Sequence, residues 1–363
     1  MTDLLESTLA QVPGFVLGCS VGGEREILAY GHRQVFGVDT PLPMESQTIF
    51  DIGSITKVLA TTAAIMRLLE EGALSLSDKV SKYLSGWAGT DKEEITVRDL
   101  LLHRSGLWEW RPLYIHTQNP RHAIQEISEI PLRYKVDEGR HYSDLGFISL
   151  GQVLTEISDS DLNVCIGKLV FEPLHLNNTR FAVPVSDSSV AATSFGDSIE
   201  REMVHSKVPY PVPELATDFR NWREHVLVGE VNDGNAFHVF GGASSHAGLF
   251  SSATDLITFG ENMNASIRGE GQYSQRIATE FLSTGPDSGQ QLGFRSWTDT
   301  FRGCTTEFFG HTGFPGTALV FSPTHDCVIA LMTNRLHTKG IPAQMEPLLK
   351  AFLDSTHQKL HSA

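Results

Sequence analysis

Apolar side chains run almost without interruption around the stretch that follows Ser54. They occupy positions 58 to 60, 63 to 65, 68 and 69, with no Pro or Gly among them, and Gly72 follows shortly after. This pattern predicts a helix that begins near Ser54 and ends at Gly72. Because its apolar positions go nearly all the way round, we expect a buried central helix.

Strand patterns lie at both ends of the chain. Residues 15 to 21 and 25 to 31 are two such runs, and the Gly22-Gly23 turn between them predicts a hairpin. Three more strands and a last helix are predicted near the C-terminus, at 307–313, 317–321, 327–332 and 341–357. The sequence therefore predicts an α+β fold in which an antiparallel sheet is flanked by helices.

The middle of the chain, residues 76 to 235, has the pattern of helices and long loops. We expect a sheet domain formed by 1–75 and 236–363, a mostly helical domain inserted between them, and an active site where the two meet. The loop-rich stretches around Pro184, Pro209, Pro211 and Pro213 are interpreted as a lid or a substrate-lining segment.

A capping box opens one helix of this middle region. Thr96 and Asp99 have the required spacing, and Gly106 ends the segment. His103 lies at the end of this helix and is interpreted as a structural histidine whose hydrogen bonds are satisfied.

Composition and charge exclude several classes of protein. The 363 residues are 40% apolar, and 28 basic against 43 acidic residues give a net charge of −15. Such a chain does not attract nucleic acid or anionic membranes. No run approaches the ~18 apolar residues of a membrane span. The acidic N-terminus differs from a signal peptide, so we expect a soluble cytoplasmic protein, although an exported protein without its signal would have the same pattern.

No metal or cofactor is expected. The four cysteines, Cys19, Cys165, Cys304 and Cys327, are scattered without a C-x-x-C pair, and we expect buried free thiols. The sequence also lacks an H-E-x-x-H motif or comparable ligand spacing.

A serine and a lysine three residues apart open the central helix. Ser54 and Lys57 share one helix face, because residues i and i+3 are neighbours there. Ser is also a common N-cap, and capping alone would explain Ser54. Burial and the positive end of the helix dipole are expected to lower the pKa of Lys57 below its ordinary value of about 10.4. A partly neutral amine accepts a proton, so the pair predicts an activated serine nucleophile.

A second candidate nucleophile is Ser20. Gly18-Cys19-Ser20-Val21-Gly22 fits the G-x-S-x-G nucleophile elbow of α/β-hydrolases. That elbow requires a strand, a sharp turn and then a helix, whereas Ser20 lies within a strand that leads into a hairpin. We therefore interpret the match as accidental.

Three short motifs occur in the order and context of one family. They are Ser54-Ile55-Thr56-Lys57 at a helix start, Tyr142-Ser143-Asp144 in the helical region and His311-Thr312-Gly313 on a predicted strand. With residues 101–107 and 229–250, they resemble the serine β-lactamases and penicillin-binding proteins, in particular the class C β-lactamase-related branch. The resemblance covers about residues 14 to 335.

The resemblance implies a role for each motif. Ser54 would form an acyl-enzyme, while Lys57 and Tyr142 would handle its proton. The backbone N–H groups of Ser54 and Phe314 would bind the oxyanion. The substrate would lie against a set of residues from the second and third motifs: Asp144, His311, Thr312, Gly313 and Phe314.

Two residues depart from the pattern of the family. Asp144 replaces an Asn, and an ionised carboxylate cannot donate a hydrogen bond to a substrate carbonyl. We expect it to pair with Lys57 and keep it charged. His311 replaces a Lys, and a histidine is largely neutral near pH 7. Both changes predict weak turnover of β-lactams.

The leading expectation is a carboxylesterase with weak β-lactam hydrolysis, acting on a small ester, amide or β-lactam. The alternatives are a D-aminopeptidase or D-Ala carboxypeptidase, and a non-catalytic scaffold of the penicillin-binding type. Structural interpretations remain for each residue: Tyr142 as a core phenol, Asp144 as a helix cap and His311 as an edge-strand residue. A further set of aromatic residues is assigned either to an apolar pocket or to the core and surface: Trp108, Trp110, Tyr114 and Phe237.

Overall fold

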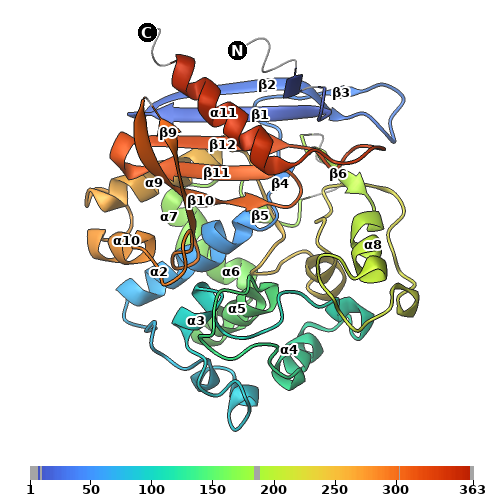
Figure 1. The fold of residues 1–363 in the computed structure, drawn as a ribbon, viewed down its shortest axis with the longest axis vertical. Helices are drawn as coiled ribbons and strands as arrows, with labels where there is room; N and C mark the ends of the chain where they lie inside the picture. The colour runs from blue at the N-terminus through green and yellow to red at the C-terminus, as the bar shows by residue number, and fades with distance from the viewer. Residues whose placement is uncertain (1–6, 9, 184–188, 302, 360–363) are drawn as a thin grey trace.

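A seven-stranded antiparallel sheet joins the two ends of the chain (Figure 1). The structure is a computed structural model that describes residues 7–8, 10–183, 189–301 and 303–359. The strands, in sheet order, are β3 (Leu42–Pro43), β2 (Glu24–Gln34), β1 (Gly14–Val21), β12 (Cys327–Thr333), β11 (Thr317–Ser322), β10 (Cys304–Gly313) and β9 (Arg295–Phe301). The predicted α+β class, the Gly22-Gly23 hairpin and the C-terminal strands are confirmed.

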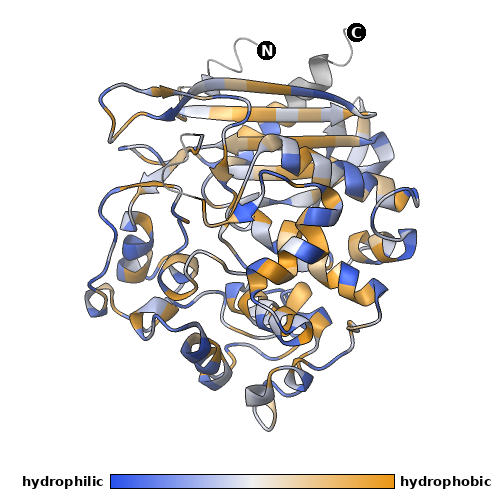
Figure 2. Cartoon of the chain, turned by 180° about the vertical axis from the view of Figure 1, so that it is seen from behind, coloured by the Kyte–Doolittle hydropathy of each residue, from blue (hydrophilic) through white to orange (hydrophobic). Residues whose placement is uncertain are grey.

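Helices cover both faces of this sheet. On one face α11 (Met345–Lys359) buries Leu348 and Phe352 against Phe15, Val320 and other strand residues. The opposite face packs against α9 (Ala253–Ile267), with α10 (Gln275–Leu282) and α2 (Ala63–Glu70) beyond it. Apolar residues are concentrated along the sheet and the helices beneath it (Figure 2). Since successive strand residues face opposite sides, a sheet covered on both faces needs apolar residues at nearly every position.

Two glycines let α9 approach the sheet closely. A Cβ added to Gly18 of β1 would lie 2.7 Å from Ile257 Cδ1, and one on Gly260 would lie 2.5 Å from Val328 Cγ1. Side chains at these positions would push the helix off the sheet.

The same packing explains the G-x-S-x-G match around Ser20. Gly18 faces α9, and the Ser20 hydroxyl is buried and donates to Glu261 of that helix. Gly22 has a φ of +57° in the hairpin turn, a conformation that favours glycine. Each residue of the match therefore has a structural role, and Ser20 does not lie on a nucleophile elbow.

The central helix begins with an unusual turn. Lys57–Thr62 is π-helical and continues directly into α2, and all six of its residues are buried. Gly72 follows with a φ of +69°, and the N–H of Ala73 donates to the carbonyl of Leu68. The predicted helix and its end are confirmed, while the wider first turns were not predicted. Single π turns of this kind are frequent at functional sites.

The middle of the chain is built from short helices. They are α3 (Val97–Leu101), α4 (Pro120–Glu129), α5 (Asp144–Ser158), α6 (Leu162–Ile166), α7 (Glu172–Leu174) and α8 (Ser198–Ser206). The capping box of Thr96 and Asp99 opens α3 as predicted.

Short strands also occur in and beside this region. They are β4 (Phe50–Asp51), β5 (Arg180–Phe181), β6 (Ala192–Phe195), β7 (Val226–Val228) and β8 (Leu249–Ser251). They form a three-stranded sheet, β4-β8-β5, and the pair β6-β7. Runs of two to four residues are too short to show a period in the sequence. The division into domains at 76 and 235 remains a prediction, and Pro184 lies outside the described residues.

The cysteines differ partly from the expectation. None of the four forms a disulfide, and only Cys165 and Cys327 are buried; Cys19 is half-buried and Cys304 is exposed at the start of β10. Strand β10 pairs there with the edge strand β9. Across the described ranges, no helix combines the length and the apolar character that a membrane span requires.

Candidate active site

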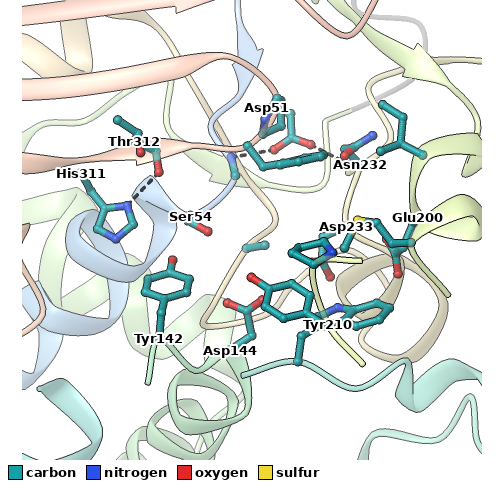
Figure 3. A pocket seen from close by; sticks show the side chains of 18 of the residues that line it. Asp51, Ser54, Tyr142, Asp144, Glu200, Tyr210, Asn232, Asp233, His311 and Thr312 are labelled. Carbon is teal, nitrogen blue, oxygen red and sulfur yellow. Dashed lines mark hydrogen bonds between the residues drawn. The ribbon is translucent and has the colours of Figure 1, made fainter. Parts of the chain in front are cut away.

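A cavity of about 490 Å³ opens beside the start of the central helix (Figure 3). Its lining includes all three predicted motifs, through Ser54, Tyr142, Asp144, His311 and Thr312. The motifs come from the central helix, the N-terminus of α5 and the end of β10. The fold therefore brings residues from three distant parts of the sequence to one opening.

A tight contact between two turns places Ser54 next to the end of β10. Gly53 has a φ of +50°, and a Cβ there would lie 2.6 Å from Pro315 Cδ and 3.1 Å from the Phe314 nitrogen. A Cβ on Gly313 would likewise lie 2.2 Å from the Ile52 oxygen. Only glycines allow this approach. It places the turn at Gly53 against the Phe314–Pro315 backbone, while the binding of an oxyanion by the N–H groups of Ser54 and Phe314 stays a prediction.

A buried carboxylate holds the turn before Ser54. Asp51 accepts hydrogen bonds from the N–H groups of Gly53, at 2.9 Å, and Asn232, at 2.7 Å. Burial raises the pKa of Asp51 to about 6, against the opposing effect of these two hydrogen bonds. Asp51 thus connects the Ser54 turn to the loop at 232, and sequence reasoning did not select it.

Lys57 is completely buried and has three oxygen atoms close to its Nζ. It donates hydrogen bonds to Ser54 Oγ at 3.0 Å and to the His246 carbonyl oxygen at 2.9 Å, and it forms an ion pair with Asp144 Oδ1 at 2.7 Å. A carboxylate this close to a buried amine favours the charged form of Lys57.

The pKa of Lys57 contradicts one prediction and agrees with another. Burial alone would lower this pKa, but the Asp144 carboxylate and the Tyr142 side chain outweigh burial and raise it above its usual value. The expectation of a lowered pKa is therefore wrong, because it omitted a partner from a distant helix. The expected pairing of Asp144 with Lys57 is present in the structure.

The second motif is held at the N-terminus of α5. Ser143 caps this helix by accepting a hydrogen bond from the Gly146 N–H at 3.0 Å, and its hydroxyl donates to the Trp108 carbonyl. Asp144 is thus not the cap, and its carboxylate is free to face Lys57. The ring of Tyr142 lies with its centroid 5.1 Å from Lys57 Nζ.

The third motif presents a neutral imidazole. His311 lies on β10, between β9 and β11, and is 3% exposed, so its interpretation as an edge-strand surface residue is wrong. Its Nδ1 donates to the Thr312 carbonyl at 2.8 Å. Burial and the nearby Lys57 ammonium lower the pKa of His311 to about 3. Its Nε2 is buried without a hydrogen-bond partner among the described residues.

A group of potential metal ligands lies behind the site. Atoms of Asp144, Asp233 and His246 come within 4.8 Å of one another. Asp144 already binds the Lys57 ammonium, and Asp233 Oδ1 lies 3.0 Å from His246 Nε2. These carboxylates are therefore compensated by side-chain cations or hydrogen bonds, and the group does not by itself indicate a metal.

Two arginines beside His311 were not selected from the sequence. Arg140 and Arg295 line the cavity, and both charges contribute to lowering the pKa of His311. Arg140 Nε donates to the Gln290 side chain at 2.7 Å. The guanidinium of Arg295 has no ion-pair partner within the described ranges. Arg140 precedes α5 and Arg295 begins β9, so their distance in the sequence concealed that both side chains line the same cavity.

The aromatic residues selected from the sequence divide between the two interpretations. Of the four aromatic residues, Trp110 lines the cavity, together with Tyr210, which was not selected. Tyr114 is buried in contact with other aromatic rings, and Phe237 lies under Arg223. Pro209, in the predicted loop, also lines the cavity.

The antiparallel sheet with its helices and the serine motif at a helix start define the fold of the β-lactamases and penicillin-binding proteins. The sequence profile of the family described as Beta-lactamase matches residues 1–352, and the chain belongs to this family.

The chain is also similar to two curated proteins and to a solved structure. The chain is 30% identical over 348 residues to a Bacillus subtilis protein named N-acetylmuramyl-L-alanine amidase, covering 88% of this chain and 76% of that one. It is 27% identical over 335 residues to an Escherichia coli protein named "Putative D-alanyl-D-alanine carboxypeptidase", covering 85% and 74%. The octameric penicillin-binding protein homologue from Pyrococcus abyssi has the same fold, with a TM-score of 0.71, 22% identity and coverage of 98% and 77%.

Proposed function

We propose that this protein is a serine amidohydrolase that forms an acyl-enzyme on Ser54 and acts on small amides whose leaving group carries a carboxylate. The observation that carries the proposal is the contact of Ser54 Oγ with the buried Lys57 ammonium, at 3.0 Å, at the edge of the cavity. Helix capping does not account for this contact, because Ser54 would not need a buried cation to cap a helix.

The proton of Ser54 passes to Tyr142 in this mechanism. Lys57 donates to Ser54 Oγ and to the His246 carbonyl and is paired with the Asp144 carboxylate, and as an ammonium it has no free electron pair, so it is not the base. The base we propose is the phenol oxygen of Tyr142, which must be deprotonated to accept the proton; the centroid of its ring lies 5.1 Å from Lys57 Nζ. In Figure 3 the hydroxyls of Ser54 and Tyr142 face the same space.

The reaction then follows the acyl-enzyme scheme. Ser54 Oγ attacks the amide carbon while its proton goes to Tyr142, and the N–H groups of Ser54 and Phe314 bind the oxyanion. The C–N bond breaks, and the amine leaves with the proton from Tyr142. Water next attacks the ester, gives its proton to Tyr142 and releases the acid, after which Ser54 regains a proton.

The two arginines favour a leaving group with a carboxylate. Arg140 and Arg295 add two positive charges to the side of the cavity that holds the neutral His311. A carboxylate placed there would gain charge-assisted hydrogen bonds. The names of both curated relatives refer to amide bonds to an alanine. We therefore place amides ahead of the neutral esters expected from the sequence, with ester hydrolysis as an accompanying activity.

The test compares wild type with Ser54→Ala on amides, esters and a β-lactam. Substrates are N-acetylmuramyl-L-alanine, N-acetyl-D-alanyl-D-alanine, p-nitrophenyl acetate, p-nitrophenyl butyrate and nitrocefin, each with and without EDTA. We expect one of the amides to be hydrolysed, EDTA to have no effect, an acyl mass to appear on wild type, and Ser54→Ala to lose at least about 10³-fold in rate.

Different results would favour other functions. Equal rates for wild type and Ser54→Ala would overturn the proposal. Fast turnover of the esters alone would restore the carboxylesterase hypothesis. If a serine-directed phosphonate labels no Ser54 and no substrate is hydrolysed, the non-catalytic scaffold is the better explanation.

A further inference from the structure

His103 lies directly behind Tyr142, in a backbone conformation that histidine seldom adopts. It ends the α3 segment with a φ of +57° and is 1% exposed. A non-glycine residue in the left-handed region costs free energy, which other contacts must offset. Its imidazole ring and its carbonyl oxygen contact the segment that carries Tyr142, while its N–H donates to the Leu100 carbonyl at 3.1 Å.

Two hydrogen bonds from His103 flank Tyr142. The imidazole Nδ1 accepts the N–H of Ser143 at 2.9 Å, and the backbone carbonyl accepts the N–H of His141 at 2.8 Å. His103 thereby holds both sequence neighbours of Tyr142, His141 and Ser143. Because the Cα atom of Tyr142 lies between these two hydrogen bonds, a displacement of His103 would displace Tyr142 as well.

The imidazole ring also fixes the phenol ring. The centroids of His103 and Tyr142 are 4.5 Å apart, and Phe147 lies 5.1 Å from the same imidazole. Lys57 Nζ and the His311 ring also lie near Tyr142, at 5.1 Å and 5.9 Å from its centroid. The phenol is therefore packed between groups whose own positions are fixed, which limits rotation of its side chain.

The hydrogen bond to Ser143 requires a neutral imidazole. Nδ1 can accept the Ser143 N–H only without a proton of its own. Burial, followed by the charges of Lys57 and Arg140, lowers the pKa of His103 well below its ordinary value. The contact therefore persists across neutral pH.

We infer that His103 is the positioning residue for Tyr142: through its hydrogen bond to Ser143 and its ring contact it holds the phenol oxygen where the Ser54 proton is transferred. This inference rests on the proposed function. A shift of about 1 Å in a proton-transfer group can cost on the order of 10²-fold in rate. His103 does not touch the reacting atoms, so its effect should fall on kcat.

The test uses two substitutions that both tolerate a positive φ. His103→Gly removes the side chain, whereas His103→Asn keeps an acceptor oxygen that can reach the Ser143 N–H. Both lose the imidazole ring, so the difference between them reports the hydrogen bond. His122→Asn on the exposed surface of α4 is the matched control. Rates of p-nitrophenyl acetate hydrolysis are divided by the fraction of Ser54 that a phosphonate labels at completion, so that misfolded protein does not contribute.

We expect His103→Gly to lower kcat by about 10- to 100-fold with KM within about 3-fold. His103→Asn should recover at least about 5-fold of this loss, and His122→Asn should match wild type. Equal kcat values for the Gly and Asn variants, or a wild-type kcat in His103→Gly, would overturn the inference. If wild type itself shows no Ser54-dependent turnover, the proposed function fails instead.

Discussion

Asp144 Oδ1 lies 2.7 Å from Lys57 Nζ, and this contact fixes the charge of the residue one turn beyond Ser54. The Lys57 side chain is fully buried, while 14% of the Asp144 side chain is exposed. A buried ammonium is tolerated only with close acceptors, and the carboxylate is the one that carries a charge. The family pattern has an amide at this position, so the ion pair distinguishes this chain from that pattern.

The first prediction concerns Asp144→Asn. Loss of the carboxylate should lower the pKa of Lys57 and destabilise the fold by about 2–4 kcal/mol, because a buried charge loses its counter-ion. The new amide can donate a hydrogen bond to a substrate carbonyl, so the ratio of nitrocefin to p-nitrophenyl acetate turnover should rise. Chemical denaturation and the two rates measure these effects.

The exposed Asp161→Asn is the control for this substitution and should leave both quantities unchanged. The pH dependence has a definite sign. Because the folded pKa of Lys57 is raised, the ion pair stabilises fully below its unfolded value of about 10.5, and this stability is lost as pH rises through the folded pKa. An unaltered nitrocefin ratio would contradict the role given to Asp144.

The second prediction concerns the arginines that line the cavity. Arg140→Gln and Arg295→Gln should each raise KM for N-acetyl-D-alanyl-D-alanine by about 10-fold or more, because a charge-assisted hydrogen bond contributes about 1.5–3 kcal/mol. The same dipeptide with an amidated C-terminus is the substrate control. If KM rises equally for the dipeptide and for its amidated form in both variants, the arginines do not recognise a carboxylate.

The third prediction is a loss of stability in acid caused by His311. Its folded pKa of about 3 lies below the ordinary value of 6.5, so only the unfolded state gains the proton between these limits. Stability therefore falls as pH decreases from 6.5, by about 3 kcal/mol at pH 4.5. His311→Gln should remove this part of the pH dependence, as measured by urea unfolding at pH 7 and 4.5.

Other groups titrate in the same interval, so the comparison of variants is essential. Burial raises the pKa of Asp51 to about 6, so the protonation of Asp51 increases the stability of the folded state as the pH falls, opposite to the effect of His311. The exposed His122→Gln should retain the wild-type difference between the two pH values. An identical acid loss in His311→Gln and wild type would show that His311 does not contribute.

The fourth prediction separates Ser20 from Ser54. Ser20→Ala removes the hydrogen bond to Glu261 and should cost about 1 kcal/mol of stability. Its kcat should remain within about 2-fold of wild type, because Ser20 lies on β1, in the large sheet and outside the cavity lining. Loss of acyl-enzyme in the mass spectrum of Ser20→Ala would reverse the assignment of the nucleophile.

Part of the site could be predicted from the sequence. The apolar run after Ser54 identified the central helix, and the spacing of Ser54 and Lys57 identified their contact. The helix and this contact depend on residues that are close in sequence, where the helix period fixes the geometry. The motifs at Tyr142 and His311 were selected through the resemblance to the β-lactamase family, whose motif order they follow.

Asp51, Arg140 and Arg295 lacked such a signal. Asp51 and Arg140 are held in the cavity by partners from other segments, Asn232 and Gln290, and Arg295 is placed by the pairing of β9 with β10. His103 was recognised as a buried structural histidine, but its contact with Tyr142 depends on how two loops pack. A periodic pattern in the sequence does not predict a contact between side chains of two loops.

The sequence by itself determined the α+β class, the central helix and the Ser54–Lys57 pair, because these follow from local periodicity and short spacings, and it determined the other two motifs through their resemblance to those of a family. Only the tertiary structure decided the charge of Lys57. Burial lowers its pKa and Asp144 raises it, and both influences were recognisable in the sequence. Which one prevails depends on the distance between two residues on different helices, since Coulomb energy varies inversely with distance and with the local dielectric.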